Sequence, residues 1–185
     1  MGSAGVRILA IDDSPFKKRT RGKCLIVGII GRGTVIEGVI SFYVDIDGRD
    51  STVQLVKAVK RTRFSSQIKV IAINGLSLAG LNIVDLGRAE RALGMHVLGI
   101  TRKKPHPKLL ARAITLSDAP DAGEKIALLQ RLSKRFPAER IDGFYVQHSW
   151  DRKEVSGIFG SAIGLLRLAN LVARGVSSGE SRGRI

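Results

Sequence analysis

One stretch of the chain, from Gln67 to Pro107, constrains the fold more than any other. It opens with an apolar run rich in β-branched residues, Ile68 to Ile73, and continues through a glycine-bearing loop and a helical pattern to a second apolar run, Val97 to Ile100. Such runs predict buried strands, with a helix between them. Because a strand, helix and strand in this order form a right-handed crossover with parallel strands, the stretch predicts an α/β fold.

Parallel strands place their carboxyl ends at one edge of a sheet, where open α/β sheets usually have their functional sites. Asn74 and Gly75 fall at the first of these ends, and the basic turn Thr101 to Lys104 falls at the second. Any site should therefore lie at this edge.

The length and composition fit one compact domain spanning residues 1–185, since 44% of the residues are hydrophobic. No apolar run reaches the roughly 18 residues that suggest a membrane span, and the amino terminus lacks a signal-peptide pattern. Cys24 is the single cysteine and lies in an apolar run, which excludes disulfides and cysteine-based zinc sites. We expect a cytoplasmic protein without a membrane partner.

The charge balance points to a polyanion. The chain has 31 Lys and Arg against 16 Asp and Glu, a net charge of +15. Binding to phosphates releases condensed counterions, so this excess favours nucleic acid as the partner. The ion-rich surfaces of thermophiles are the alternative, but they raise acidic residues together with basic ones, and here the acids are few.

The first half of the chain predicts three antiparallel strands. Val6 to Ile11 forms the first, which Pro15 prevents from continuing as a ladder. The runs Cys24 to Ile30 and Val35 to Ile46 follow, joined by Gly31 to Thr34, whose residues suit a tight hairpin.

Helix ends are marked in three places. A capping box predicts a helix from Ser51 to about Thr62, Asn82 and Gly94 bound the helix of the central stretch, and a second capping box opens a helix from Asp121 to about Phe136. The antiparallel strands followed by strand and helix units predict a ribonuclease H-like fold. In that fold a mixed sheet carries an antiparallel three-strand meander and then parallel strands, with helices on both faces.

The end of the chain predicts one more strand, Ile141 to Gln147, and a glycine-spaced helix from about Val155 to Val172. From about Gly175 the chain is rich in Ser, Gly and Arg, so we expect a mobile tail.

Five motifs resemble a known family. They are ILAIDDSPF, CLIVGIIGRGTVIEGVISFYVDIDG, RFSSQIKVIAINGLSLAGLNIVD, MHVLGITRKKP and LRLANLVARGVSSGESRGRI. Together they cover nearly the whole chain and resemble the uncharacterised, mostly archaeal domain of unknown function 99. That family is similar in turn to endonuclease V, a ribonuclease H-like nuclease that uses carboxylate-bound magnesium to cut beside deaminated bases.

The resemblance to endonuclease V implies three site positions. Its first metal-binding Asp corresponds to Asp12 in AIDDS, its second corresponds to Asn74 in INGL, and its basic turn corresponds to Thr101 to Lys103. Asn74 offers a neutral carbonyl where the nuclease has a carboxylate, which weakens a Mg²⁺ site and the activation of bound water. We therefore expect a nucleic-acid-binding protein whose Mg²⁺-dependent phosphodiester hydrolysis is weak or lost.

Asp12 and Asp13 are adjacent, so only one of them can face a given side of the sheet. Asp12 is the candidate metal ligand, and Asp13 could orient the following turn. In the alternative reading both carboxylates merely end the strand and pair with Lys17 or Arg19.

Two further carboxylates are candidates. Asp47 could be a second metal ligand, or it could serve only the turn in which it lies. Asp85 could complete the catalytic site with Asn74, or it could cap the central helix. His148 follows the last predicted strand but has no partner in the sequence, so we do not assign it as a general base.

Two basic clusters could bind phosphate. Arg102, Lys103 and Lys104 lie at the predicted site edge, and Lys60 and Arg61 lie at the end of the first predicted helix. The alternative functions are a non-catalytic module that binds RNA or a ribonucleoprotein, which Asn74 favours, and a structural protein-interaction domain, which would show little salt-sensitive affinity for polyanions. The choice of DNA or RNA and the oligomeric state stay open.

Overall fold

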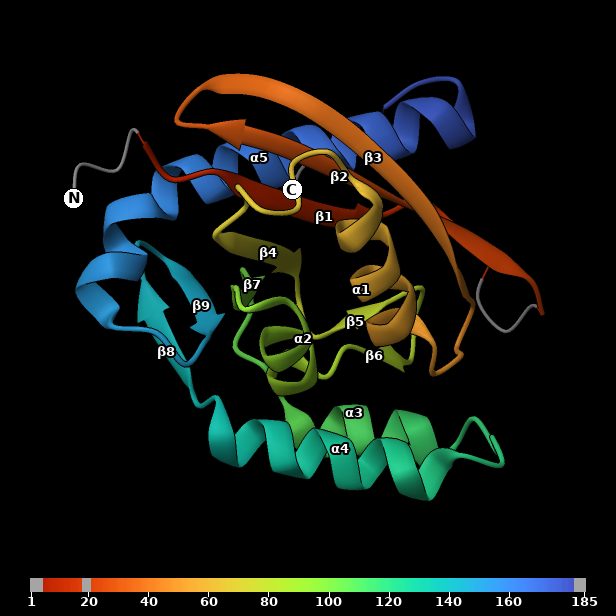
Figure 1. Ribbon diagram of the computed structural model, residues 1–185. Helices are drawn as coiled ribbons and strands as arrows, with labels where there is room; N and C mark the ends of the chain where they lie inside the picture. Colours follow the sequence, from red (N-terminus) through yellow and green to blue (C-terminus); the bar gives the residue numbers. More distant parts are fainter. Residues whose placement is uncertain (1–4, 18–20, 182–185) are drawn as a thin grey trace.

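The structure, a computed structural model, describes residues 5–17 and 21–181 and is built on a seven-stranded sheet (Figure 1). The strand order is β3-β2-β1-β4-β7-β9-β8. A separate two-stranded ribbon, β5 and β6, lies in the loop after β4. The bounds are β1 Ile8–Asp13, β2 Lys23–Arg32, β3 Val35–Asp45, β4 Val70–Asn74, β5 Ser77–Leu78, β6 Asn82–Ile83, β7 His96–Thr101, β8 Ala138–Ile141 and β9 Phe144–Gln147.

The pairing confirms the predicted mixed sheet. β1, β2 and β3 are antiparallel, whereas β4 runs parallel to β1 with Ile8 opposite Val70 and Ile11 opposite Ile73. β7 is parallel to β4, so three neighbouring strands end at the same edge. Asp12 and Asn74 are thereby brought to adjacent strand ends.

Helices cover both faces of the sheet, as predicted, and the alternation of side chains along β1 divides the core in two. Leu9 and Ile11 pack in the core that contains α1, α2, α3 and α4, while Ile8 and Ala10 pack in the core that contains α5. The helices are α1 Ser51–Arg61, α2 Leu86–Leu93, α3 Pro107–Thr115, α4 Ala122–Arg135 and α5 Arg152–Ser178.

The long helix α5 is a core helix in this fold. Among the described residues it is the one helix long and apolar enough to cross a membrane by length and composition. Its buried residues, including Val155, Ile158 and Phe159, pack in the same core as residues of β1 and β2. Burial against the sheet accounts for its apolar face.

Several predicted boundaries differ from the structure. In place of the single strand predicted from Ile141 to Gln147, β8 and β9 form a hairpin, because Asp142 and Gly143 adopt φ angles of 45° and 83° and turn the chain between them. The helix α3 was not predicted. Residues 175–178, placed in the tail by the sequence, are the last turn of α5, and residues 182–185 lie outside the described part.

Two predicted helix caps are wrong, because both side chains bind elsewhere. Ser51 Oγ donates to the carbonyl of Ile83, and Asp50 occupies the N-cap position of α1. Asn82 lies in β6, where its side chain accepts from the backbone N–H of Ser51. Asp85 caps α2 instead, whereas the predicted stop at Gly94 is confirmed by a φ of 66°.

Candidate functional site

A cleft of about 300 Å³ lies where β1, β4 and β7 end. It brings together residues that the sequence placed at one edge, Asp12, Asn74 and the basic turn, with residues of β9 and α5. The lining residues are Asp12, Asn74, Ile100, Thr101, Arg102, Lys103, Phe144, Ile163, Leu166, Asn170 and Arg174.

Asp12 is buried at the floor of the cleft, with 3% of its surface exposed. Asn74 Nδ2 donates to both of its carboxylate oxygens, at 3.2 and 3.1 Å, and Asn170 Nδ2 donates to Oδ2 at 2.8 Å. The backbone N–H of Asp13 donates to Oδ1 at 2.9 Å. The donors of these hydrogen bonds are all neutral N–H groups.

Burial raises the pKa of Asp12, and the hydrogen bonds from Asn170 and Asn74 partly oppose that shift because they stabilise the charged form. The charge of Arg174 opposes it as well. The pKa of Asp13 rises to about 6, chiefly through burial and then through repulsion by Asp12. The two adjacent carboxylates thus share an environment that disfavours two negative charges.

Asp13 binds the loop that contains β5 and β6, a contact that neither reading of the sequence proposed. Its Oδ2 accepts from the backbone N–H of Ala79 at 2.6 Å. Of the two cations with which Asp12 and Asp13 might have paired, Arg19 lies outside the described residues. Asp13 therefore connects the end of β1 to the loop that contains β5 and β6.

The donor set of the cleft does not fit a strong Mg²⁺ site. Mg²⁺ prefers oxygen ligands that include one or two carboxylates. Among the lining residues Asp12 alone is acidic, and the amides of Asn74 and Asn170 turn their N–H groups toward it. The described residues also contain no cluster of three His, Cys, Asp or Glu side chains that could hold a metal.

Asn170 and Arg174 are site residues that sequence reasoning missed. They lie on α5, one helical turn apart, and both line the cleft. Helix periodicity could not show which face of α5 meets the end of β1. The available signal was the motif LANLVARG, which contains both residues and which belongs to one of the five stretches that carry the family resemblance.

The basic turn is positioned as predicted at the rim of the cleft. Arg102 and Lys103 line the cleft, and Arg102 lies 5.5 Å from the ring centre of Phe144. Thr101 Oγ1 donates to the carbonyl of Lys103 at 2.8 Å, which fixes the turn. Lys104 is exposed beyond the lining residues.

The other predicted phosphate-binding residues lie elsewhere. Lys60 and Arg61 are the last two residues of α1. Arg61 lines a separate groove of about 320 Å³ between α1 and β3, together with Lys57 and Phe42. This groove shares no lining residue with the cleft at Asp12.

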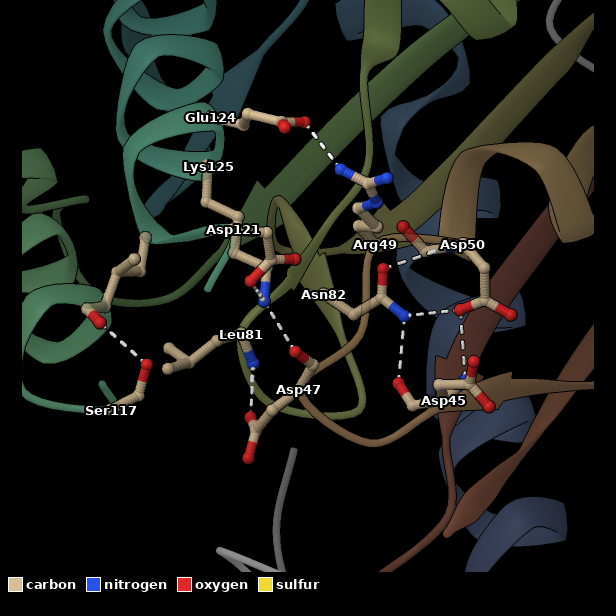
Figure 2. A network of polar contacts seen from close by, with 12 residues as sticks. Asp45, Asp47, Arg49, Asp50, Leu81, Asn82, Ser117, Asp121, Glu124 and Lys125 are labelled. Atoms are coloured by element: carbon tan, nitrogen blue, oxygen red, sulfur yellow. Dashed lines mark hydrogen bonds and ion pairs between the residues drawn. The ribbon is translucent and has the colours of Figure 1, made fainter. Parts of the chain in front are cut away.

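Asp47, the second predicted metal ligand, does not line the cleft. Its Oδ1 accepts from the backbone N–H of Leu81 at 2.8 Å, and its carbonyl accepts from Lys125 Nζ at 2.5 Å (Figure 2). Asp47 has a φ of 53°, so it lies in the turn that the alternative reading described. Its side chain holds the same loop that Asp13 holds through Ala79.

Lys125 is a buried cation on α4 that contacts a different part of the chain. It is 3% exposed, and its Nζ lies 3.2 Å from Oδ1 of Asp121, the N-cap residue of α4 (Figure 2). Through its bond to the carbonyl of Asp47 it ties α4 to the chain between β3 and α1.

Asp85 also lies outside the cleft at Asp12. It caps α2 by accepting from the backbone N–H of Arg88 at 3.0 Å, and its Oδ2 pairs with Arg131 at 2.9 Å. It lines a different pocket of about 600 Å³ between α1, α2 and α4. The capping alternative from the sequence matches this geometry.

An apolar pocket of about 310 Å³ adjoins the cleft and shares Asn74 and Thr101 with it. Leu76, Pro105 and Leu110 contribute apolar walls. An apolar space thus lies directly beside the polar, basic cleft.

The histidines next to the sheet have structural contacts. His148 Nε2 bonds to Glu139, and Nδ1 lies 3.0 Å from the carbonyl of Trp150. The ring of Trp150 stacks on His96 with centroids 4.4 Å apart. Neither histidine lines the cleft, so neither is positioned as its general base.

The strand order and the polar cleft at the carboxyl edge define a protein with the ribonuclease H-like architecture of endonuclease V. Residues 4–177 match the family described as endonuclease dU, and the chain belongs to that family. It is 31% identical to a UPF0215 protein of Methanothermobacter thermautotrophicus, over 96% of this chain and 91% of that protein. It is 32% identical to a UPF0215 protein of Deinococcus radiodurans, over 95% of this chain and 91% of that protein.

Solved structures confirm the predicted fold. A protein of unknown function from Archaeoglobus fulgidus superposes with a TM-score of 0.83 at 29% identity, covering 94% of this chain and 99% of that one. Endonuclease V from Bacillus subtilis superposes with a TM-score of 0.55 at 11% identity, covering 90% of this chain and 78% of that one. At that identity the second likeness shows the fold alone.

Proposed function

We propose that this protein binds nucleic acid in the cleft at Asp12 and that its metal-dependent phosphodiester hydrolysis is weak or lost. The observation that carries the proposal is the surroundings of Asp12. Its carboxylate oxygens accept from the amides of Asn74 and Asn170, while Arg102 and Lys103 form a cationic rim beside it.

The rim supports phosphate binding. Arg102 and Lys103 belong to a turn that is held by Thr101. The net charge of +15 also attracts polyanions to the protein in general. Contacts from Lys and Arg to phosphates supply affinity that does not depend on sequence. The adjoining apolar pocket offers room for a base next to the bound backbone.

The weakness of catalysis follows from charge. In metal-assisted hydrolysis a cation must stabilise the attacking and leaving oxygens at the phosphate. A single carboxylate that already accepts hydrogen bonds from two amides attracts such a cation less than a pair of carboxylates does. The cleft therefore favours binding over cleavage.

The second candidate is an active endonuclease, which the description of the family favours. It requires the side-chain amides of Asn74 and Asn170 to rotate, so that their carbonyl oxygens face a cation together with Asp12. Measurable cleavage of nucleic acid that depends on Mg²⁺ and is abolished by Asp12→Ala would support this candidate against the proposed function.

The proposal is tested by the salt dependence of binding to duplex and single-stranded DNA and RNA. If about five phosphates are contacted, the slope of log affinity against log salt for a duplex should be near −4 to −5. The variant Arg102→Ala/Lys103→Ala should lose about two phosphate contacts, and the slope should become correspondingly less steep. A matched control is Lys60→Ala/Arg61→Ala, which removes the same charge from the end of α1 and should bind as the parent does. Equal slopes for the parent and the Arg102→Ala/Lys103→Ala variant would mean that nucleic acid binds elsewhere on the protein and not in the cleft.

A further inference from the structure

The outer edge of β3 is unpaired. β3 is the terminal strand of the sheet, runs for 11 residues, and forms the long outer ribbon in Figure 1. Among the described residues β2 is its only strand partner. One row of its backbone N–H and C=O groups therefore faces outward, which is the arrangement that allows another strand to add to a sheet.

Exposed apolar side chains accompany this edge. Val39 and Tyr43 are 57% and 56% exposed, although they pair with Ile29 and Leu25, which contribute to the core under α5. A β-bulge between Ile36 and Gly38 leaves Glu37 as an extra residue and pairs Ile36, 50% exposed, with Gly31.

These three side chains extend the apolar face of the sheet beyond the helix that covers it. A methyl group placed on Gly31 would meet Leu165 of α5, so Ile36 lies on the α5 face, as Val39 and Tyr43 do. The packing of α5 is concentrated on β1 and β2. The apolar strip of Ile36, Val39 and Tyr43 is therefore left uncovered in the single chain.

Apart from the bulge at Glu37, β3 lacks the devices that usually protect an edge strand. Natural edges carry bulges, Lys, Pro or inward-pointing charges, or are very short. Between residues 35 and 44 the only charged side chain is Glu37, and it pairs within the chain with Arg7 and Arg32. The strand has no proline, and its exposed middle has no charge that would repel an identical strand.

We propose that β3 pairs with β3 of a second copy of this chain, which makes one continuous sheet across a two-fold axis. An antiparallel pair formed by one segment with itself is self-complementary, because each copy supplies the same donors and acceptors. The axis lies perpendicular to the sheet, so the two uncovered strips meet on one face, between the two α5 helices. A different protein would need a matching neutral strand, whereas a second copy already has one.

The bulge limits the register. The ladder is interrupted at Glu37, so regular pairing begins at Gly38 and can extend to the end of β3 at Asp45. A centre at Ser41 places Val39 of each copy opposite Tyr43 of the other. Aromatic and β-branched residues are favourable cross-strand neighbours.

Analytical ultracentrifugation of the protein without nucleic acid tests this inference. The 20.0 kDa chain should sediment at twice its mass. Val39→Lys places two like charges near the axis and should weaken self-association by about tenfold or more. Leu109→Lys is the matched control, because Leu109 is 63% exposed on α3 and should have no effect. A monomer at tens of micromolar, or a Val39→Lys variant that dimerises like the parent, would overturn the proposal.

Cross-linking checks the register separately. Ser41→Cys adds an exposed thiol on β3, while the native Cys24 is buried. A short bifunctional thiol reagent should link two copies of this variant and should not link Ser117→Cys, which carries its thiol beyond α3. Failure of Ser41→Cys to link, in a protein that sediments as a dimer, would reject the pairing through β3. Neither experiment depends on nucleic-acid binding.

Discussion

The side-chain amide of Asn74 donates to both carboxylate oxygens of Asp12, a residue 62 positions earlier in the chain. Parallel pairing of β1 with β4 creates this contact, since both residues stand at the ends of those strands. In the proposed function this carboxylate and amide stand where the resemblance to endonuclease V implies two carboxylates. Substitutions at these two residues can therefore distinguish nucleic-acid binding from metal-dependent hydrolysis.

Restoring an acid at this position should make the protein respond to Mg²⁺. Without the ion, Asn74→Asp places a second negative charge beside Asp12 and should lower the free energy of unfolding by roughly 1 kcal/mol or more. With Mg²⁺ the variant should gain melting temperature beyond the parent, because an ion bound only by the folded state stabilises it. Thermal unfolding with and without Mg²⁺ measures both effects.

The control for this experiment is Asn74→Asp combined with Asp12→Ala. The double variant has one carboxylate, as the parent does, so its response to Mg²⁺ should fall to the parent's level. If Asn74→Asp is destabilised and remains indifferent to Mg²⁺, the two positions do not form a cation site.

Removing the side-chain amide of Asn170 should destabilise the protein, because the buried carboxylate of Asp12 loses a hydrogen-bond donor. Asn170→Leu takes away the 2.8 Å hydrogen bond to Asp12 Oδ2 and should reduce the free energy of unfolding near pH 7 by about 1–3 kcal/mol. Urea denaturation provides the measurement. Arg167→Ala, at an exposed position of the same helix, is the control and should change stability by less than about 0.5 kcal/mol. Equal losses in the two variants would mean that Asn170 contributes only as part of the helix.

The carboxyl of Asp13 should give stability a measurable pH dependence. Its pKa is about 6 in the folded chain against an ordinary value of 3.8. The folded state therefore holds this proton more tightly than the unfolded state, so its contribution is present at low pH and is lost as pH rises from about 4 to about 6. The loss is at most about 3 kcal/mol.

The variant Asp13→Asn should lack that decline, because its amide stays neutral while its oxygen can still accept from Ala79. Denaturant midpoints for parent and variant, measured from pH 4 to 7, give the difference. A difference that stays constant with pH would show that Asp13 does not titrate in this range.

The buried lysine of α4 should matter for stability more than a surface ion pair does. Lys125→Met removes the donor to the carbonyl of Asp47 and leaves Asp121 without its cation, so we expect a loss of about 2–3 kcal/mol. Arg49→Ala breaks the exposed pair with Glu124 and should cost less than about 1 kcal/mol. Equal losses would mean that the buried contact adds nothing beyond a surface pair.

Much of the fold could be predicted because its signals are local. The apolar runs at Ile68 and Val97 gave parallel strands, and the hairpin residues between Gly31 and Thr34 gave the antiparallel pair. The residues that cap the helices were harder to predict. Ser51 and Asn82 are good capping residues in isolation, yet they bond to each other's segments, since Ser51 N–H donates to Asn82 Oδ1 across the loop.

The candidate site shows the same division. Strand direction was enough to bring Asp12, Asn74 and Arg102 to one edge, because every parallel strand ends there. It was not enough to place Asp47 and Asp85, whose positions depend on how a turn and a helix pack against the sheet.

The sequence by itself determined that this chain forms a mixed sheet with a polar, basic edge, because periodicity, turn residues and net charge are properties of the chain alone. Tertiary structure decided that the amides of Asn74 and Asn170 converge on Asp12 from a strand and from a helix near the end of the chain. It also decided that the apolar residues of β3 stay uncovered by α5. The physical reason is that hydrogen bonds and burial depend on distances between segments, which exist only once helices and strands have packed together.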